Sequence, residues 1–357
     1  MILFLALPAI ALLFSILNVA TMRVVRNSDA KEIVESVSIL IPMRNEERNV
    51  EAVLNSVLTT SLISNREIVV LNDNSTDSTA KLLEMFPTVK RILGTELPVG
   101  WLGKNFACHQ LVAHSTGTYL VFVDADVRLS ELSIAAAITD MNEYGWDFIS
   151  PYPRQIAVSF FERLIQPLLQ WSWLASIPLR LAEKQKFSSM IIANGQFFIV
   201  RRDPYIKVGG HKTIRNEILD DLELARLLVT QGFTGGVADG SAVAECRMYR
   251  SQSELFAGYS KSLWRAFGSP LGTVFTPFIL IFSGVVPLIL ALSGYRQAWI
   301  GYFLIVLSRY VAAARTRSTP STALLHPLAI CVLIYLIALS WYQKLTGQLV
   351  WRERSVN

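Results

Sequence analysis

Between residues 37 and 150, short apolar runs alternate with stretches in which apolar side chains recur every three or four positions. Strands that alternate with helices in this way form a mostly parallel sheet with both faces covered, so the fold class is α/β. The expected strands are 37–42, 67–72, 89–93, 118–124 and 147–150, and the expected helices are 47–59, 76–86, 104–115 and 130–143, the last with Ser130 as its cap.

Four longer apolar stretches flank this region: 1–22, 271–293, 297–314 and 323–342. The first is long enough to cross a bilayer core of about 30 Å. No basic residue precedes it and Arg23 and Arg26 follow it, which is the reverse of a cleavable signal peptide. We therefore expect an uncleaved anchor whose C-terminal side lies in the cytoplasm of a multi-pass protein of the inner or plasma membrane.

The number of C-terminal crossings stays open. If every stretch spans, the tail at 343–357 lies outside, although its Lys344, Arg352 and Arg354 favour the cytoplasm. Gly284 and Pro287 interrupt the stretch at 271–293, and Arg309 shortens the one at 297–314. One stretch is therefore expected to be re-entrant or interfacial.

The segment 158–182 is rich in Phe, Leu and Trp, and Pro167 and Pro178 are expected to break it into pieces. It suits an interfacial helix with Trp171 and Trp173 at the level of the lipid headgroups. A buried helix of the globular domain explains the same composition equally well.

Composition supports a membrane protein with one sizeable globular domain. Hydrophobic residues make up 52% of the 357 residues and charged residues only 17%, and the mean hydropathy is +0.39. The net charge of +5 comes without a Lys/Arg block or zinc-ligand spacing, so no nucleic-acid partner is expected, and the excess suits anionic lipids and a nucleotide diphosphate. Cys108, Cys246 and Cys331 show no paired spacing and are expected to be small buried side chains.

Carboxylates follow two of the expected strands. Asp124 and Asp126 end the apolar run at 121–123, at the edge where open α/β sheets bind ligands, and two acids there suit a divalent cation that grips a diphosphate. Asp73 follows the strand at 67–72 and could accept the imide N–H of a uracil ring. The chain has no Gly-x-Gly-x-x-Gly, which disfavours a dehydrogenase-type dinucleotide fold.

Three motifs occur in an ordered set: Pro42-x-x-Asn45-Glu46, the block at 72–77, and Asp124-Ala125-Asp126. In this order they resemble the family 2 glycosyltransferases of the GT-A fold, over roughly residues 37–265. The resemblance implies that Pro42 and Asp73 lie at the nucleotide, with Asp73 on the uracil and Asp124 by the ribose. It also implies that Asp126, with Asp124 beside it, holds Mg²⁺ or Mn²⁺ on the diphosphate. Glu46 is either a nucleotide contact or a charge at a helix N-terminus.

Asp220 and Asp221 resemble the acidic pair of the same family, in which the first member is usually Glu. Asp221 aligns with the general base, which removes a proton from the acceptor hydroxyl as it attacks the anomeric carbon. A single displacement of this kind inverts that carbon. Two acids that open a helix also interact favourably with its dipole, and this would explain the pair taken alone; with the other motifs, we favour Asp221 as the base.

Processive members of the family carry a Gln/Arg-x-x-Arg-Trp motif that this chain lacks, so transfer of a single sugar is expected. The segment 98–104, the residues Asn194, Gly195 and Gln196, and the segment 258–261 resemble instead a membrane-bound branch that includes carotenoid-acid and hopanoid-associated glycosyltransferases. Lys104 is then a phosphate contact or an exposed lysine at a helix start. Asn194, Gly195, Gln196 and Lys261 form part of the sugar or acceptor pocket, with a plain turn as the alternative for 194–196.

The sequence thus predicts a cytoplasmic GT-A domain at 35–265, between an anchor at 1–22 and helices at 271–342. It would transfer a sugar from a UDP-sugar to a membrane lipid, with a carotenoid or other isoprenoid acid as the narrowest candidate. A polyprenyl phosphate or a glycerolipid is the alternative acceptor, and an inert membrane scaffold is the alternative from another class. A nucleotidyltransferase would need a basic, glycine-rich loop, which the segment 42–47 is not.

Overall fold

The computed structural model describes residues 3–267, 270–351 and 354–355, and they form two compact units. The sheet unit comprises Arg23–Arg154 and Leu181–Cys246. The helical unit comprises the described parts of 1–22, 155–180 and 247–357. The domain predicted at 35–265 therefore contains residues of both units.

The sheet unit is built on a seven-stranded sheet with the order β3-β2-β1-β4-β8-β6-β9. All neighbouring pairs are parallel except those of β8, which runs antiparallel to both β4 and β6. The strands are β1 Val37–Met43, β2 Arg66–Asn72, β3 Lys90–Leu93, β4 Tyr119–Val123, β6 Phe148–Tyr152, β8 Phe197–Arg201 and β9 Gly235–Asp239.

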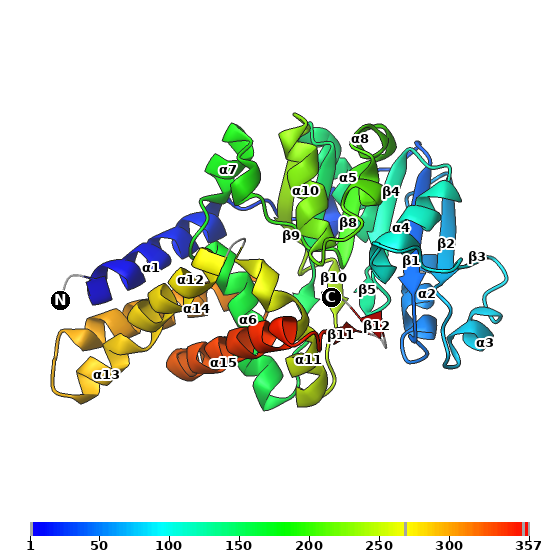
Figure 1. Cartoon of the computed structure of the whole chain (residues 1–357). Helices are drawn as coiled ribbons and strands as arrows, with labels where there is room; N and C mark the ends of the chain where they lie inside the picture. Colours follow the sequence, from blue (N-terminus) through cyan, green and yellow to red (C-terminus); the bar gives the residue numbers. More distant parts are fainter. Residues whose placement is uncertain (1–2, 268–269, 352–353, 356–357) are drawn as a thin grey trace. The chain divides into compact units, whose positions relative to one another are not determined.

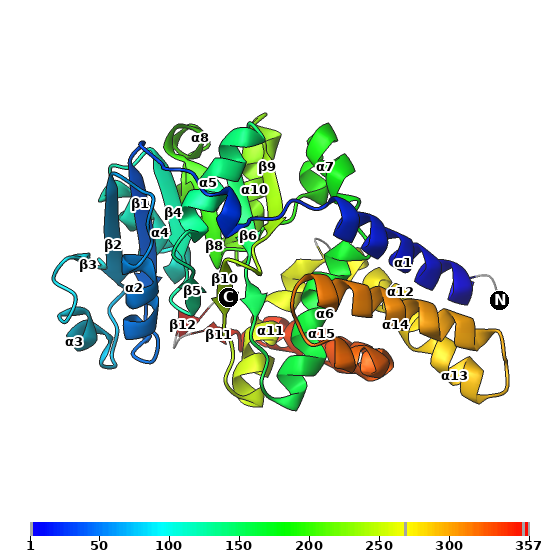
Figure 2. The ribbon, with the colours of Figure 1, turned by 180° about the vertical axis from the view of Figure 1, so that it is seen from behind.

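Helices cover both faces of this sheet (Figure 1 and, from behind, Figure 2). One face carries α4 (Gly103–Ala113), α8 (Arg202–Lys207) and α10 (Asp220–Thr230), which share a single hydrophobic cluster with alternate residues of the strands. The other face carries α2 (Val50–Leu58) and α5 (Ser133–Glu143). The predicted α/β class with a mostly parallel sheet is confirmed.

The chain between these helices and strands also forms shorter elements. They are η1 Asn27–Asp29, α3 Thr79–Leu83, β5 Val127–Leu129, β7 Arg154–Gln155, α7 Leu179–Gln185, η2 Ser188–Met190, α9 Gly210–Thr213 and β10 Ala244–Cys246.

Two predictions about helix starts were wrong. The helix expected at 76–86 is only α3, because the polar residues before it bond to a neighbouring loop instead of entering the helix. Ser130 caps no helix, because β5 pairs with β10 just before it and its hydroxyl lies 3.0 Å from Asn27 Oδ1. The helix begins three residues later, at Ser133.

The helical unit contains α1 Leu3–Thr21, α6 Phe160–Leu174, α11 Gln252–Ala266, α12 Pro270–Gly284, α13 Val286–Leu292, α14 Ala298–Arg315, η3 Pro320–Leu325, α15 His326–Leu345, and the short β11 Val350–Trp351 and β12 Arg354–Ser355. Within the described residues, three segments are long and apolar enough to cross a membrane: Phe4–Thr21, Leu271–Leu292 and Pro320–Leu345. The stretch predicted at 297–314 forms α14, which is not among them and carries Arg309.

Helix α14 packs closely along α1 (Figures 1 and 2). A Cβ at Gly301 would lie 2.5 Å from the carbonyl oxygen of Phe4, so only glycine permits this approach. The hydroxyls of Ser15 and Ser308 lie 2.9 Å apart across the same contact. Small and hydroxylated residues of this kind are typical of helix pairs in membranes.

Helix α6 continues through Pro167, so the prediction that this proline breaks it was wrong. A proline removes the N–H that the carbonyl four residues earlier would accept. Here that carbonyl, of Arg163, accepts a hydrogen bond of 2.9 Å from the Thr322 hydroxyl. Only Pro178 lies between two helices, α6 and α7.

The structure buries two tryptophans of α6 and exposes one cysteine. Trp171 and Trp173 are buried in the helical unit, and the indole of Trp171 donates to Ser308 Oγ at 2.8 Å. Cys108 and Cys246 are buried as expected, whereas Cys331 is exposed on α15. Cys331 lies in Pro320–Leu345, a segment that is long and apolar enough to cross a membrane.

Candidate functional site

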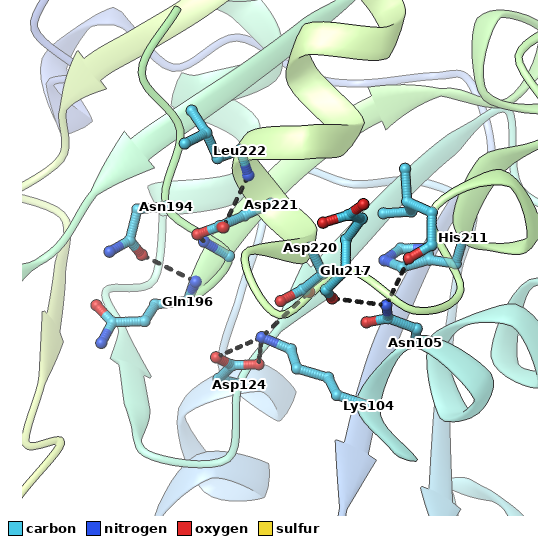
Figure 3. Close-up of polar contacts among 12 residues, drawn as sticks. Lys104, Asn105, Asp124, Asn194, Gln196, His211, Glu217, Asp220, Asp221 and Leu222 are labelled. Atoms are coloured by element: carbon cyan, nitrogen blue, oxygen red, sulfur yellow. Dashed lines mark hydrogen bonds and ion pairs between the residues drawn. The ribbon is translucent and has the colours of Figure 1, made fainter. Parts of the chain in front are cut away.

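A lysine lies among carboxylates at the carboxyl edge of the sheet (Figure 3). Lys104 is the second residue of α4, Asp124 is the first residue after β4, and Asp220 begins α10. The Lys104 Nζ atom lies 3.0 Å from each carboxylate oxygen of Asp124 and 3.6 Å from Asp220 Oδ2. Lys104 is therefore paired within an acidic site and is not simply a solvated lysine at a helix start.

The turn at 194–196 connects the two acidic positions. The Asp124 N–H donates to the Gln196 carbonyl at 3.0 Å, and the Gly195 N–H donates to Asp221 Oδ2 at 2.6 Å. Asn194 Oδ1 accepts the Gln196 N–H at 2.9 Å, which closes the turn before β8. Residues 194–196 thus do form a turn, as the alternative interpretation had it, and this turn also positions two of the expected site residues, Asp124 and Asp221.

Gly195 lies close to two of the expected site side chains. A Cβ there would lie 3.1 Å from the Asp221 Cβ and 3.2 Å from Lys104 Nζ. An alanine at this position would therefore have to move Asp221 or Lys104 by a few tenths of an ångström.

Asp221 is held by two backbone donors. Its Oδ2 accepts from Gly195, and its Oδ1 accepts the Leu222 N–H at 2.7 Å. Burial, reinforced by the charge of Asp220 and opposed by Lys104, raises the pKa of Asp221 to about 6. A fixed carboxylate with a pKa near the working pH can act as a general base.

Asp124 and Asp126 are half-buried acids with raised pKa values. Burial raises the pKa of Asp124 to about 7 against the effect of Lys104, with Asp126 adding to the rise. Burial likewise raises the pKa of Asp126, and its Oδ1 is buried without a hydrogen-bond partner. Among the described residues no group of three or more His, Cys, Asp or Glu is arranged as a ready-made metal site. Two neighbouring carboxylates with one unsatisfied oxygen nevertheless fit a divalent cation that also takes ligands from a diphosphate.

A pH dependence of cation binding follows from these acids. Because the pKa values of Asp124 and Asp221 are raised, the folded protein binds more protons than the unfolded chain from about pH 4 to 7. The contribution of the protonated acids to the stability of the fold is therefore lost as the pH rises through about 7. A cation must displace those protons. We expect Mn²⁺ to raise the melting temperature more at about pH 8 than at about pH 5.5. Equal rises at both values, in the wild type, would contradict this assignment of the acids.

Replacing Lys104 by methionine is expected to destabilise the cation-free protein. The change leaves Asp124 and Asp220 without their positive partner, and hydrogen bonds to charged groups contribute about 1.5–3 kcal/mol. Melting temperature in EDTA should therefore fall for Lys104→Met, and Mn²⁺ should restore much of the loss. Lys81→Met, at an exposed position on α3, is the matched control. Equal melting of the two variants in EDTA would show that Lys104 does not stabilise the acids.

The loops after β1 and β2 are joined by hydrogen bonds. Asn45 Oδ1 accepts the Thr76 N–H at 2.8 Å, and the Glu46 N–H donates to Thr79 Oγ1 at 2.8 Å. Asp73 is buried between them, with its N–H bonded to the Met43 carbonyl at 2.8 Å. Ser75 and Thr76 therefore join the two loops at the edge where Asp73 lies, and Asp77 Oδ1 accepts the Thr79 N–H at 2.9 Å at the start of α3.

A pocket of about 300 Å³, including its open mouth, lies at this edge. Its lining includes six of the predicted site residues: Pro42, Lys104, Asp124, Gly195, Asp220 and Asp221. Asn194 and Gln196 flank Gly195, and Asp126 lies two residues beyond Asp124, whereas Glu46 and Asp73 belong to the neighbouring loops. Lys261 lies on α11 of the helical unit, so its place in a pocket stays a prediction.

The sequence did not point to His211, which lines the pocket. Its Nδ1 lies 2.9 Å from the Tyr205 hydroxyl, and burial lowers its pKa to about 4, so the ring is neutral near pH 7. The preceding Gly209-Gly210 pair was the available signal. Gly210 has φ +50°, and a Cβ there would lie 2.2 Å from the Tyr205 ring.

Asn105 was also missed. It is buried, and its Nδ2 donates to the carbonyls of Ile214 at 2.8 Å and Glu217 at 3.0 Å (Figure 3). These bonds fix the loop that leads into α10 and hence the start of the acidic pair. Its position next to Lys104 was the only signal in the sequence.

Comparison with known proteins agrees with this geometry. Residues 38–209 match the model of the glycosyl transferase family 2. The chain is 24% identical over 340 residues to the 4,4'-diaponeurosporenoate glycosyltransferase of Staphylococcus aureus strain USA300. The aligned region covers 90% of this chain and 88% of that protein. The protein of the same name from strain bovine RF122 is 25% identical over the same length.

A solved structure shares the fold. The mannosyltransferase PcManGT from Pyrobaculum calidifontis, in complex with GDP-Man and Mn²⁺, superposes with a TM-score of 0.56 at 18% identity, over 96% of this chain and 98% of that one. The likeness establishes the GT-A fold. The family match at residues 38–209 and the diaponeurosporenoate relatives show that this chain is a glycosyltransferase with a family 2 domain.

Proposed function

We propose that the chain transfers a single sugar from a UDP-sugar to a lipid acceptor in the membrane, with inversion and with a divalent cation. The observation that carries the proposal is the pocket in which Lys104 and Asp124 lie beside an Asp221 that two backbone donors hold in place. Three segments able to cross a membrane add the reason for a lipid acceptor.

In the proposed reaction, Asp221 takes the proton of the acceptor hydroxyl as that oxygen attacks the anomeric carbon. Asp126 and Asp124 would hold Mg²⁺ or Mn²⁺, which would supply Lewis-acid stabilisation of the departing diphosphate. Lys104, which pairs with Asp124 at 3.0 Å, would add a positive charge beside the same group. One displacement on the face opposite the leaving group inverts the anomeric centre.

The remaining predicted residues would orient the two substrates. Pro42, Glu46 and Asp73 lie on β1 or on the loops after β1 and β2, where the uracil and ribose would bind. Asn194, Gln196 and Lys261 would contact the sugar or the acceptor.

Membrane topology supports a cytoplasmic site in this proposal. With three crossings, the sheet-forming segments and the tail at 343–357 lie on the same side. Arg23 and Arg26 then share that side with the tail's Lys344, Arg352 and Arg354, which the positive-inside rule favours, whereas Arg296, Arg315 and Arg317 fall on the opposite side. The conflict that four crossings would create for the tail disappears when α14 does not span. A carotenoid acid, named in the relatives' activity, is the narrowest proposed acceptor.

The test is UDP release by the detergent-purified full chain with UDP-glucose and Mn²⁺. Acceptors would include an isoprenoid acid, a polyprenyl phosphate and a diacylglycerol, and EDTA would serve as the control. Release that needs both a lipid and a cation supports the proposal and identifies the acceptor class. A parallel reaction with GDP-mannose tests the donor that PcManGT binds. Turnover with GDP-mannose alone would overturn the UDP assignment, and no turnover with either donor would favour an inert scaffold.

A further inference from the structure

An arginine is buried in the helical unit without an acidic partner. Arg309 on α14 is 1% exposed, and it forms no ion pair with any residue that the structure describes. Its Nη2 donates to the Leu164 carbonyl at 2.6 Å and lies 3.4 Å from Thr322 Oγ1. Its Nε and Nη1 are buried and have no hydrogen-bond partner.

A buried histidine lies in the same region. His326, the first residue of α15, is 0% exposed, and neither of its ring nitrogens has a partner among the described residues. Its ring meets the edge of Trp171 at a centroid distance of 4.7 Å, and Trp171 donates to Ser308, the neighbour of Arg309. Arg309 and His326 are close enough to interact electrostatically.

Part of this arrangement has a structural explanation. Pro167 disturbs the hydrogen bonding of α6, and the Nη2 of Arg309 satisfies the nearby carbonyl of Leu164. The bond to Leu164 uses one nitrogen of the guanidinium and does not involve His326. Three buried N–H donors on Nε and Nη1 of Arg309, and one N–H of a neutral His326, are left unexplained.

Such a set of donors is suited to an oxyanion. A guanidinium presents its N–H groups as a planar fork that fits the two oxygens of a carboxylate or phosphate. An unpaired buried charge is costly, and an ionisable residue inside a helical membrane unit is usually functional. His326 lies in Pro320–Leu345, a segment that is long and apolar enough to span a membrane. An oxyanion that binds there therefore has to be part of an apolar molecule.

We infer that Arg309 and His326 bind the carboxylate or phosphate group of a membrane amphiphile within the helical unit. The inference goes beyond the proposed transferase activity and requires none of the residues assigned to it. Leu328 and Tyr335, exposed on α15, offer apolar surface for the chain of such a molecule.

The test is direct binding of radiolabelled palmitate and of lysophosphatidic acid to the detergent-purified full chain, without any sugar donor. Monopalmitoylglycerol is the neutral control, and inorganic phosphate is the soluble competitor. We expect saturable binding of one or both acids, at least tenfold weaker binding of the neutral glyceride, and no competition by phosphate at millimolar concentration. The two acids distinguish a carboxylate from a phosphate ligand.

Three variants locate the site. Arg309→Gln and His326→Gln should each weaken binding of the acid at least tenfold, and Arg296→Gln, at an exposed position before α14, should leave it unchanged. Melting temperature separates binding from folding, because the acid should raise it for the wild type and not for Arg309→Gln. If Arg309→Gln fails to fold, Arg309→Lys, which keeps the charge and loses the fork, should bind at least threefold more weakly. Equal binding by the wild type and the folded Arg309 variants, or equal binding of acid and neutral glyceride, would overturn the inference.

Discussion

Replacing Asp126 by alanine is expected to lower sugar transfer by on the order of 10³-fold. A Lewis-acid cation contributes several kcal/mol to the stabilisation of a departing diphosphate, and each 1.36 kcal/mol corresponds to a factor of about 10 in rate. Asp126 offers a buried carboxylate oxygen that no hydrogen-bond donor occupies, which makes it the strongest candidate to hold the cation. The rate of UDP release at saturating donor and Mn²⁺ measures the loss.

Two further measurements make this prediction specific. Asp203→Ala, at an exposed position on α8, should keep the wild-type rate. The rise in melting temperature that Mn²⁺ causes should disappear in Asp126→Ala, because the cation no longer binds. A variant that keeps cation-dependent turnover within about tenfold of the wild type would remove Asp126 from the cation site.

Replacing Asp221 by asparagine is expected to have an effect that depends on the acceptor. With an acceptor that attacks through a hydroxyl group, the loss of a positioned base should lower kcat by about 10²- to 10⁴-fold. With an acceptor carboxylate, which is already ionised, the loss should be less than about tenfold because no proton has to be removed. Asparagine keeps the size of the side chain but can accept only one of the two backbone N–H bonds that Asp221 accepts, so the melting temperature of the variant should be measured beside its activity.

The pH profile provides a second measurement on the same variant. The pKa of Asp221 is raised to about 6, so hydroxyl-dependent turnover by the wild type should fall as the pH drops below about 6. Glu223→Gln, on the same helix but outside the pocket lining, is the matched control and should retain the wild-type profile. Full activity of Asp221→Asn with every acceptor would exclude Asp221 as the base.

Much of the sheet unit could be predicted because the pattern that indicates it is local. Strands β1, β2 and β4 each centre on a run of apolar residues, and each ends within one residue of its predicted boundary. The acids that follow β2 and β4 therefore had to lie at the same edge of the sheet. The predicted proximity of Asp124 to the pair at 220–221 came from the family resemblance and not from this local pattern.

Other features depend on contacts between residues far apart in the chain, and those are not visible in a local pattern. The antiparallel β8 inserts between β4 and β6, a pairing that no periodicity specifies. The continuity of α6 through Pro167 depends on Thr322, which lies 159 positions beyond the carbonyl it satisfies. The pairing of Lys104 with Asp124 joins a helix start to a strand end, and the residue type alone indicated only a lysine at a helix start.

The turn at 194–196 has a mechanical consequence for the site. It bonds through Gln196 to the backbone of Asp124 and through Gly195 to the carboxylate of Asp221, so the acids of the donor side and the acceptor side share one short support. A shift of this turn would move both acids at once. In the proposed reaction, donor binding at Asp124 and the position of Asp221 would therefore be coupled through three residues of backbone, and an acceptor that displaced the turn would also shift Asp124.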